Sequence, residues 1–177
     1  DKGYNLTYWL LGNMYAEGLA VKKDDRAAKY YYETGDDLNV YGCQNELGVA
    51  YATGSFVEKD MDKAMNYYLK AANNGSTVAM SNLASNYSRK DSGFYDPSQA
   101  VVWYRKLVDG GNEKFVDYLI DLYEEMGDFR DAIMLYEKQA SQGNTSALNQ
   151  LAYIYAQGKG VNKDYDKALL YIEEAIS

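Results

Sequence analysis

The hydrophobic residues of this chain recur in one pattern that appears five times. Its anchor is a Leu, then a residue that is usually small, two further positions and a Tyr, with the tyrosines at Tyr15, Tyr51, Tyr87, Tyr123 and Tyr155. Their spacings are 36, 36, 36 and 32 residues, and an alanine keeps the same register at Ala28, Ala64, Ala100, Ala132 and Ala168. A fixed period of this size is typical of a solenoid, in which each unit packs on its neighbours. We therefore predict an all-α solenoid forming a single domain over 1–177, with helix-turn-helix repeats at about 5–39, 40–75, 76–111, 112–143 and 144–177.

The second repeat illustrates the two helices that we expect in each unit. Residues 42–53 place Leu47 and Tyr51 on one helical face, and Gly54 then ends the helix. A second helix is expected over 61–72, where apolar residues recur every three or four positions and form one stripe.

The expected helix ends carry residues with a physical reason to be there. An Asp precedes every second helix, where it can accept hydrogen bonds from free backbone N–H groups, at Asp24, Asp60, Asp96, Asp128 and Asp164. Pro97 follows Asp96 at a first helical position, where its missing N–H costs nothing. Three second helices are followed by a glycine, which can take the left-handed backbone conformation that ends a helix. The residue after each glycine is an expected N-cap of the next helix. The pairs are Gly75–Ser76, Gly111–Asn112 and Gly143–Asn144.

The small residue of the anchor predicts a close approach of two helices. Gly48 inside a helix costs about 0.5–1 kcal/mol relative to Ala, so tight packing has to repay it. Repeat four departs from this rule because Ile120 holds the position, and its loop at 126–129 is four residues shorter. We expect an altered helix crossing angle there.

The fifth repeat resembles the Sel-one-like repeat (SLR), a relative of the tetratricopeptide repeat with a longer loop. Residues 147–171 read ALNQLAYIYAQGKGVNKDYDKALLY, and the family pattern is matched at Gly158, Gly160, Val161, Asp164, Lys167 and Ala168. The resemblance covers roughly residues 5–176, although repeat three is degenerate in its loop. It implies a right-handed superhelix of antiparallel helix pairs whose first helices line a concave face. It also implies an adaptor, since family members serve mostly in bacterial envelope or host-interaction proteins and in eukaryotic protein quality control.

Charge and composition narrow the class of partner. The formal net charge is −8 and the pI is about 4.6, so nucleic acid, which is bound by Lys and Arg, is excluded as an expected partner. A basic or polar protein segment fits better. No apolar run approaches the roughly 18 residues of a membrane span, so direct membrane insertion is not expected. The chain starts at Asp1 without Met, which suggests an excised or processed piece, and cytoplasmic and exported locations both stay open.

Residues for common catalytic chemistry are missing from the chain. There is no His and a single Cys, so no Ser-His-Asp triad and no His- or Cys-rich zinc site can form. Cys43 aligns with Ala79 and Ala147 of other repeats, which favours a small buried packing residue over a reactive thiol. We therefore predict a protein that is not an enzyme and that uses no cofactor or metal.

Positions one turn away from the Leu/Tyr stripe are expected to form the recognition surface. These positions are more polar and variable than the core positions. The candidate partner-binding residues are Trp9, Asn13, Asn45, Ser81, Ser85, Asp117, Asp121, Glu124, Glu125, Asn149 and Tyr153.

Two features of this surface have competing interpretations. In repeat four, Asp117, Asp121, Glu124 and Glu125 share one helical face, which is either an acidic patch for Lys or Arg of a partner or a solvated face of an acidic protein. Trp9 is either an anchor for a partner or a packing residue of the first helix.

The sequence thus favours a non-enzymatic SLR scaffold that binds a protein or peptide in its concave groove. The alternative is a module that self-associates by stacking its terminal repeats, because Tyr171, Ile172 and Ile176 leave an apolar edge that needs more chain or a partner. A third possibility is a glycan-binding domain or an enzyme that uses surface carboxylates and tyrosines. Further repeats in a longer parent chain are compatible with all three.

Overall fold

The protein is built from consecutive α-helices joined by short loops. The computed structural model describes residues 2–176, and the side chains of residues 6–176. The chain forms two compact units, one up to Arg89 and the other from Lys90. The first unit contains α1 (Lys2–Glu17), α2 (Asp25–Asp37), α3 (Tyr41–Thr53), α4 (Met61–Asn73) and α5 (Thr77–Ser88). The second contains α6 (Pro97–Asp109), the 3-10 turn η1 (Glu113–Phe115), α7 (Val116–Met126), α8 (Phe129–Ser141), α9 (Thr145–Gln157) and α10 (Tyr165–Ile176).

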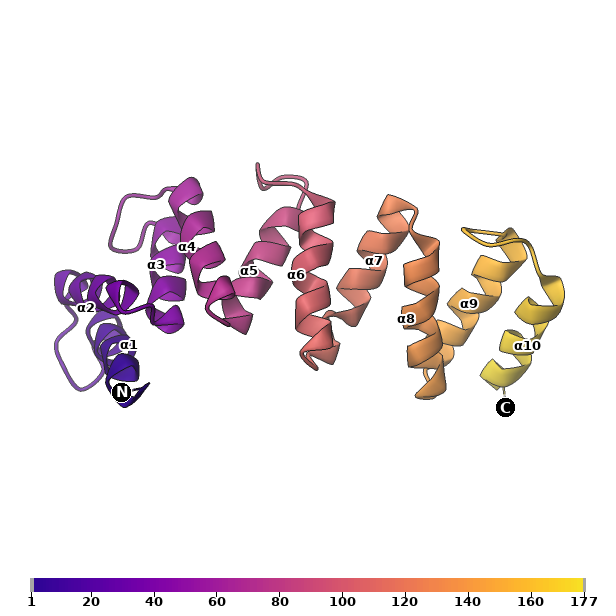
Figure 1. Ribbon diagram of the computed structural model, residues 1–177, viewed down its shortest axis with the longest axis horizontal. Coiled ribbons are helices and arrows are strands. Elements are labelled where there is room, and N and C mark those ends of the chain that lie inside the picture. The colour runs from indigo at the N-terminus through magenta and orange to yellow at the C-terminus, as the bar shows by residue number, and fades with distance from the viewer. Residues whose placement is uncertain (1, 177) are drawn as a thin grey trace. The chain divides into compact units, whose positions relative to one another are not determined.

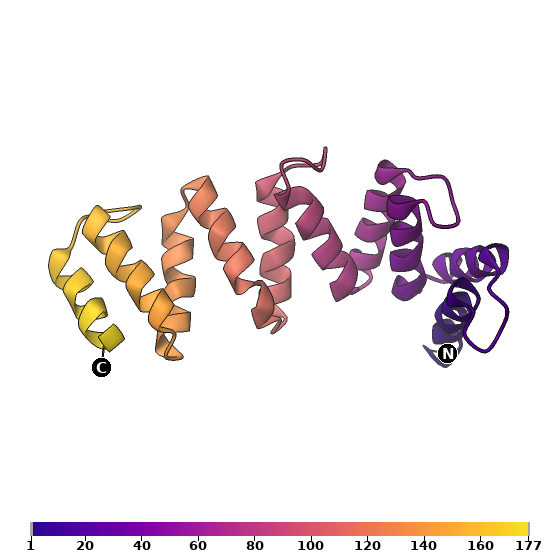
Figure 2. The same cartoon turned by 180° about the vertical axis from the view of Figure 1, so that it is seen from behind.

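Helices pair as the repeats predict. The first and second helices of a repeat run antiparallel and in contact in the pairs α1–α2, α3–α4, α7–α8 and α9–α10 (Figures 1 and 2). Within each unit, a second helix also packs on the first helix of the next repeat, as α2 does on α3 and α8 on α9. The predicted all-α class and helix-turn-helix repeats are therefore confirmed, whereas a single continuous domain stays a prediction.

Most of the predicted helix starts are correct. Asp24, Asp60, Asp96 and Asp164 accept backbone N–H hydrogen bonds from the first turns of α2, α4, α6 and α10, at 2.9–3.1 Å. These bonds satisfy amides that have no partner inside the helix. Asp128 was expected to do the same but makes no side-chain cap, because the short loop gives it a backbone conformation of φ −83° and ψ 55° rather than an extended one.

The N-caps predicted for the first helices of the repeats are correct in two of three cases. Ser76 and Asn144 accept hydrogen bonds from Ala79 N and Ala147 N, both at 3.2 Å, as predicted. Asn112 does not cap α7, because η1 intervenes and its amide donates to the Leu107 carbonyl at 3.2 Å instead.

The ends of second helices turn through a left-handed residue. Gly75, Gly111 and Gly143 have φ between +85° and +96°, which confirms their predicted role. Asn39 takes the equivalent place in repeat one with φ +58°, a conformation that Asn tolerates better than most residues.

The anchor glycines allow an aromatic ring to lie directly on the helix backbone. A Cβ at Gly48 would lie 2.6 Å from Cδ1 of Tyr68, which is far closer than two carbon atoms can approach. The anchor tyrosines Tyr15, Tyr51 and Tyr155 stack on a second-helix tyrosine, with ring centroids 5.6 Å apart for Tyr51 and Tyr67. The predicted close approach at Gly48 is thus confirmed.

The core of the first unit centres on Ala28, Tyr32, Cys43 and Leu47. Cys43 is fully buried, and its sulfur lies so close to Gly35 that no side chain fits there. Burial raises the pKa of the Cys43 thiol to about 12, so it is a packing residue rather than a reactive thiol, as predicted.

Candidate functional site

Three carboxylates of α7 gather on one side of the second unit. Asp117 and Asp121 are exposed and Glu124 is half-buried. Asp117 Oδ1 accepts a hydrogen bond from the Gln139 amide at 2.8 Å, and Glu124 Oε1 accepts one from the Tyr136 hydroxyl at 3.1 Å. Burial raises the pKa of Tyr136, and the negative charges of Glu124, Asp121 and Asp117 raise it further. The three carboxylates therefore act together on the same side of α7. We call Asp117, Asp121 and Glu124 the acidic face.

Glu125, expected in the same patch, has partners of its own. Its Oε1 lies 2.6 Å from Lys90 Nζ and accepts a hydrogen bond from the Tyr95 hydroxyl at 2.8 Å. These two contacts lower the pKa of the Glu125 carboxyl. Glu125 thus fixes the segment before α6 and contributes little free charge to the acidic face.

An apolar groove lies on the first unit, where α1, α3 and the start of α5 meet. Leu6, Trp9, Tyr41 and Val78 form its walls, and its volume is about 680 Å³. Leu6, Tyr41 and Val78 are each more than half exposed, which is unusual for three large apolar side chains around one hollow. We call this hollow, together with Asn45 and Glu46 at its polar side, the unit 1 groove.

Trp9 is a packing residue of the first helix, as one of the two interpretations of the sequence expects. Its ring packs against the core of the first unit and covers Gly42, where a Cβ would lie 2.9 Å from Trp9 Cδ1. The indole nitrogen is buried and makes no hydrogen bond of normal geometry. The same side chain forms one wall of the unit 1 groove, and its role as an anchor for a partner stays a prediction.

A short polar network supports the groove. Asn45 is only 6% exposed, so this candidate residue offers little surface to a partner. Its Nδ2 donates to Glu46 Oε1 at 3.4 Å, and its Oδ1 accepts from the Asn82 amide at 3.2 Å. Burial raises the pKa of the Glu46 carboxyl, an effect that the adjacent Asn45 amide and Trp9 indole oppose and the charge of Glu17 reinforces.

Glu46 was missed by the sequence analysis. It lies one residue after the expected Asn45, in a register position held by Leu10, Asn82, Tyr118 and Gln150 in the other repeats. Of the side chains described, it is the only charged one that lines the groove. A single acidic residue at an otherwise uncharged register position is the signal that could have found it.

The remaining candidates are spread over both units. In the first, Asn13 accepts a hydrogen bond from the buried Tyr32 hydroxyl at 2.7 Å, and Ser81 and Ser85 are partly exposed on α5. In the second, Asn149 and Tyr153 are exposed on α9. Lys159 Nζ lies 4.7 Å from the centre of the Tyr153 ring, an attractive cation–π contact.

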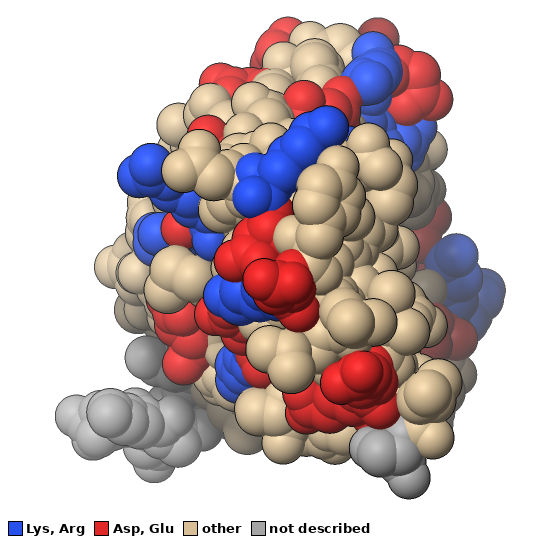
Figure 3. Space-filling model, turned by 90° about the vertical axis from the view of Figure 1, so that its right-hand side faces the viewer, with Lys and Arg blue, Asp and Glu red and all other residues tan. Residues whose placement is uncertain are grey.

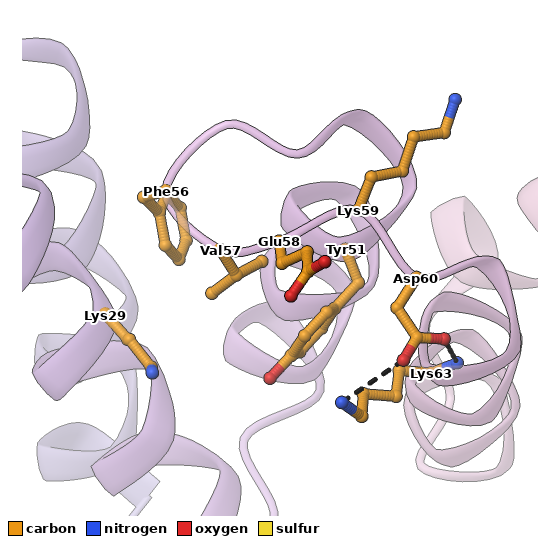
Figure 4. Close-up of a pocket in the computed structure, with 8 residues that line it drawn as sticks. All are labelled: Lys29, Tyr51, Phe56, Val57, Glu58, Lys59, Asp60 and Lys63. Carbon is orange, nitrogen blue, oxygen red and sulfur yellow. Dashed lines mark hydrogen bonds and ion pairs between the residues drawn. The ribbon is translucent and has the colours of Figure 1, made fainter.

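A second hollow lies beneath the loop between α3 and α4 and has a volume of about 410 Å³ (Figure 4). Asp60 and Lys63, which line it, form an ion pair of 3.2 Å, and Lys63 Nζ lies 5.4 Å from the Tyr51 ring centre. Figure 4 shows Glu58 beside Tyr51 and Lys59 pointing away. Because Asp60 also caps α4, its contacts belong to the loop structure rather than to ligand recognition.

An apolar stripe lies along α10 at the far end of the second unit. Tyr165, Leu169, Ile172 and Ile176 follow each other at intervals of four, three and four residues, so they share one face, and all are exposed. Leu169 is 54% exposed, whereas its register equivalent Ile133, in a helix packed on α9, is 6% exposed. Figure 3, viewed from the α10 side, shows uncharged surface between acidic and basic side chains.

The described part of the chain holds no cluster of three or more His, Cys, Asp or Glu residues able to bind a metal ion. Among the described helices, none is both long and apolar enough to cross a membrane.

Comparison with known proteins identifies the repeat from which the chain is built. The family model of the Sel1 repeat matches residues 7–35, 42–76, 77–112, 125–144 and 145–177, and so skips the acidic face. The sel1-like repeat-containing protein L21 of Acanthamoeba polyphaga mimivirus is 32% identical over 123 residues, which are 68% of this chain and 22% of that protein. The ERAD-associated E3 ubiquitin-protein ligase component HRD3 of Candida glabrata is 26% identical over 117 residues, 62% of this chain and 14% of that protein.

One solved structure agrees over nearly the whole chain. A protective antigen of uropathogenic Escherichia coli that displays an SLR fold is 30% identical, with a TM-score of 0.70 over 99% of this chain and 38% of that one. The chain therefore spans well under half of each of these three proteins.

Proposed function

The chain belongs to the Sel1 repeat family, and from that premise we propose that it is a non-enzymatic scaffold that binds a protein or peptide through its first helices. HRD3, which shares the repeat, is named as a component of a ubiquitin ligase, so it works as part of an assembly. An assembly role of this kind supports the same class of function here.

The acidic face is the observation that carries the proposal. Like charges three or four residues apart on a helix repel each other at a cost of a few tenths of a kcal/mol. Among the described residues, no Lys or Arg forms an ion pair with Asp117, Asp121 or Glu124. A partner segment that carries Lys or Arg would relieve this repulsion, and we propose that such a segment binds there.

The test is an affinity pulldown from the native source with three matched baits. One is the wild type, one carries Asp117→Lys with Asp121→Lys, and one carries Asp166→Lys with Glu173→Lys on exposed positions of α10. The two variants change the net charge equally. A protein held by the wild type and the α10 variant but lost from the α7 variant supports the proposal, whereas equal recovery on all three baits refutes the acidic face as the binding site.

The α10 stripe favours a second candidate function, self-association. In α8, the residues at the repeat positions of Leu169 and Ile176 are apolar and buried, because α9 packs on α8. We propose that a second copy of the chain covers the stripe on α10. Sedimentation velocity over a range of concentrations should then show a rising mass that Leu169→Gln with Ile176→Gln abolishes, and a concentration-independent monomer would rule this out.

A further inference from the structure

The chemistry of the unit 1 groove defines a ligand more closely than the family does. Its walls, formed by Leu6, Tyr41, Val78 and Trp9, are apolar, and Glu46 is the one charged residue among the described side chains that line it. We propose that the groove binds a peptide segment in which an Arg lies between apolar residues, with the guanidinium at the Glu46 carboxylate. This inference rests on the scaffold function proposed above and names a partner class for a second surface.

The Glu46 carboxylate has unused capacity to accept hydrogen bonds. A carboxylate offers about four acceptor sites on its two oxygens. Asn45 Nδ2 donates to Glu46 Oε1 over a long 3.4 Å. The Trp9 indole also lowers the pKa of the Glu46 carboxyl, so these two neighbours together leave about two of its acceptor sites for a ligand. Asn45 is in turn held by Asn82 of α5 at 3.2 Å, so the network fixes the carboxylate from one side and leaves donors to come from the groove.

Burial makes a cationic ligand favourable at this position. A half-buried carboxylate without a cation is poorly solvated, and burial accordingly raises the pKa of Glu46. Arg suits it better than Lys, because the planar guanidinium presents several donors in a fixed fork and is more weakly hydrated.

The walls and the size of the groove agree with a peptide. A volume of about 680 Å³ lies within the usual range of ligand pockets, roughly 300–1,000 Å³. The exposed Leu6, Tyr41 and Val78 can bury apolar side chains on either side of the cation. Acidic peptides and phosphorylated ligands are disfavoured, because Glu46 would repel them and no Lys or Arg lines the groove among residues 6–176.

The two tryptophans of the chain allow a direct test. The probe is the acetylated and amidated pentapeptide Gly-Leu-Arg-Leu-Gly, compared with peptides in which norleucine or Glu replaces Arg. Binding is followed by the indole N–H signals of isotope-labelled protein. Trp9 reports on the groove, and the buried Trp103 of the second unit serves as an internal control.

The Arg peptide should shift the Trp9 signal saturably at millimolar concentration and leave Trp103 unchanged. Glu46→Gln keeps the shape and removes the charge, so the affinity for the Arg peptide should fall about tenfold, while weak binding of the norleucine peptide is unaffected. Glu58→Gln, on the exposed α3–α4 loop outside the groove, is the matched control and should leave both affinities unchanged. Val78→Arg should also weaken Arg-peptide binding, because it places a competing cation on an exposed wall.

Two results would overturn the inference: no saturable shift of Trp9 with the Arg peptide, or equal affinities for the wild type and Glu46→Gln. The scaffold proposal fails separately, because its pulldown depends on Asp117 and Asp121 in the other unit. Loss of a partner by the α7 variant together with a silent Trp9 signal would reject the groove alone.

Discussion

Replacing Gly48 with Ala adds one methyl group to a site that has no room for it. The new Cβ would lie 2.6 Å from Cδ1 and Cε1 of Tyr68 and 3.3 Å from the Ala64 carbonyl oxygen. Overpacking of this kind costs about 1–3 kcal/mol, and the better helix propensity of Ala returns about 0.5–1 kcal/mol. The two ranges leave a net loss of at most about 2.5 kcal/mol, and we expect about 1 kcal/mol in the free energy of unfolding of the first unit.

The assay is urea and thermal unfolding followed by far-ultraviolet circular dichroism. For a cooperative unit of this size, a loss of about 1 kcal/mol corresponds to a fall in Tm of roughly 4–8 °C. Tyr68→Leu supplies the control, because a smaller side chain removes the clash and Gly48→Ala should then be neutral or stabilising. The reasoning is refuted if Gly48→Ala raises the stability of the otherwise unchanged chain, since the Tyr68 ring would then be free to move aside.

Three further predictions concern single side chains. Asp60→Ala should lower the free energy of unfolding by about 1 kcal/mol, because it removes the α4 cap. Asp128→Ala should lower it by less than about 0.5 kcal/mol, because Asp128 makes no such bond. Urea titration of the two variants and the wild type measures both losses. Burial raises the pKa of Tyr68 to about 12, against about 10 in an unfolded chain, so its contribution to stability is complete below pH ~10 and is lost between pH ~10 and ~12. Unfolding at rising pH should show this loss and Tyr68→Phe should reduce it, while an unchanged profile would contradict it. Cys43 should react with a thiol reagent only as the first unit unfolds, so the labelling rate should rise with denaturant; rapid labelling of the native protein would show that the site opens.

The fold was predictable because its signals are local and repeat. Asp60 and Gly54 mark helix ends by backbone chemistry that acts within a few residues, and their counterparts recur at a fixed period. The errors at Asn112 and Asp128 both lie in repeat four, where η1 and a shortened loop replace the usual connections. The cap rule assumes an extended residue directly before the helix, and neither Asn112, which η1 separates from α7, nor Asp128, with ψ 55°, meets that condition.

The candidate site was less predictable because it depends on helix rotation. One residue along an α-helix turns the side chain by about 100°, so the neighbours Asn45 and Glu46 differ in exposure: Asn45 is buried and Glu46 is half-buried. The groove also depends on the packing of Trp9 over Gly42, a contact between helices of two different repeats that no single repeat encodes. Likewise, the pairing of Glu125 with Lys90 depends on a loop conformation that periodicity does not describe.

Packing of each helix against its neighbours along the chain has a consequence for how the protein is made. Contacts that are close in sequence give a low contact order, and helical proteins of this type fold in microseconds to milliseconds. Synthesis proceeds at about 5–20 residues per second, so a repeat of 36 residues takes roughly two to seven seconds to emerge. A pair such as α3 and α4 therefore has ample time to form on the ribosome before the next helix appears, and its apolar stripe is covered soon after it leaves the exit tunnel.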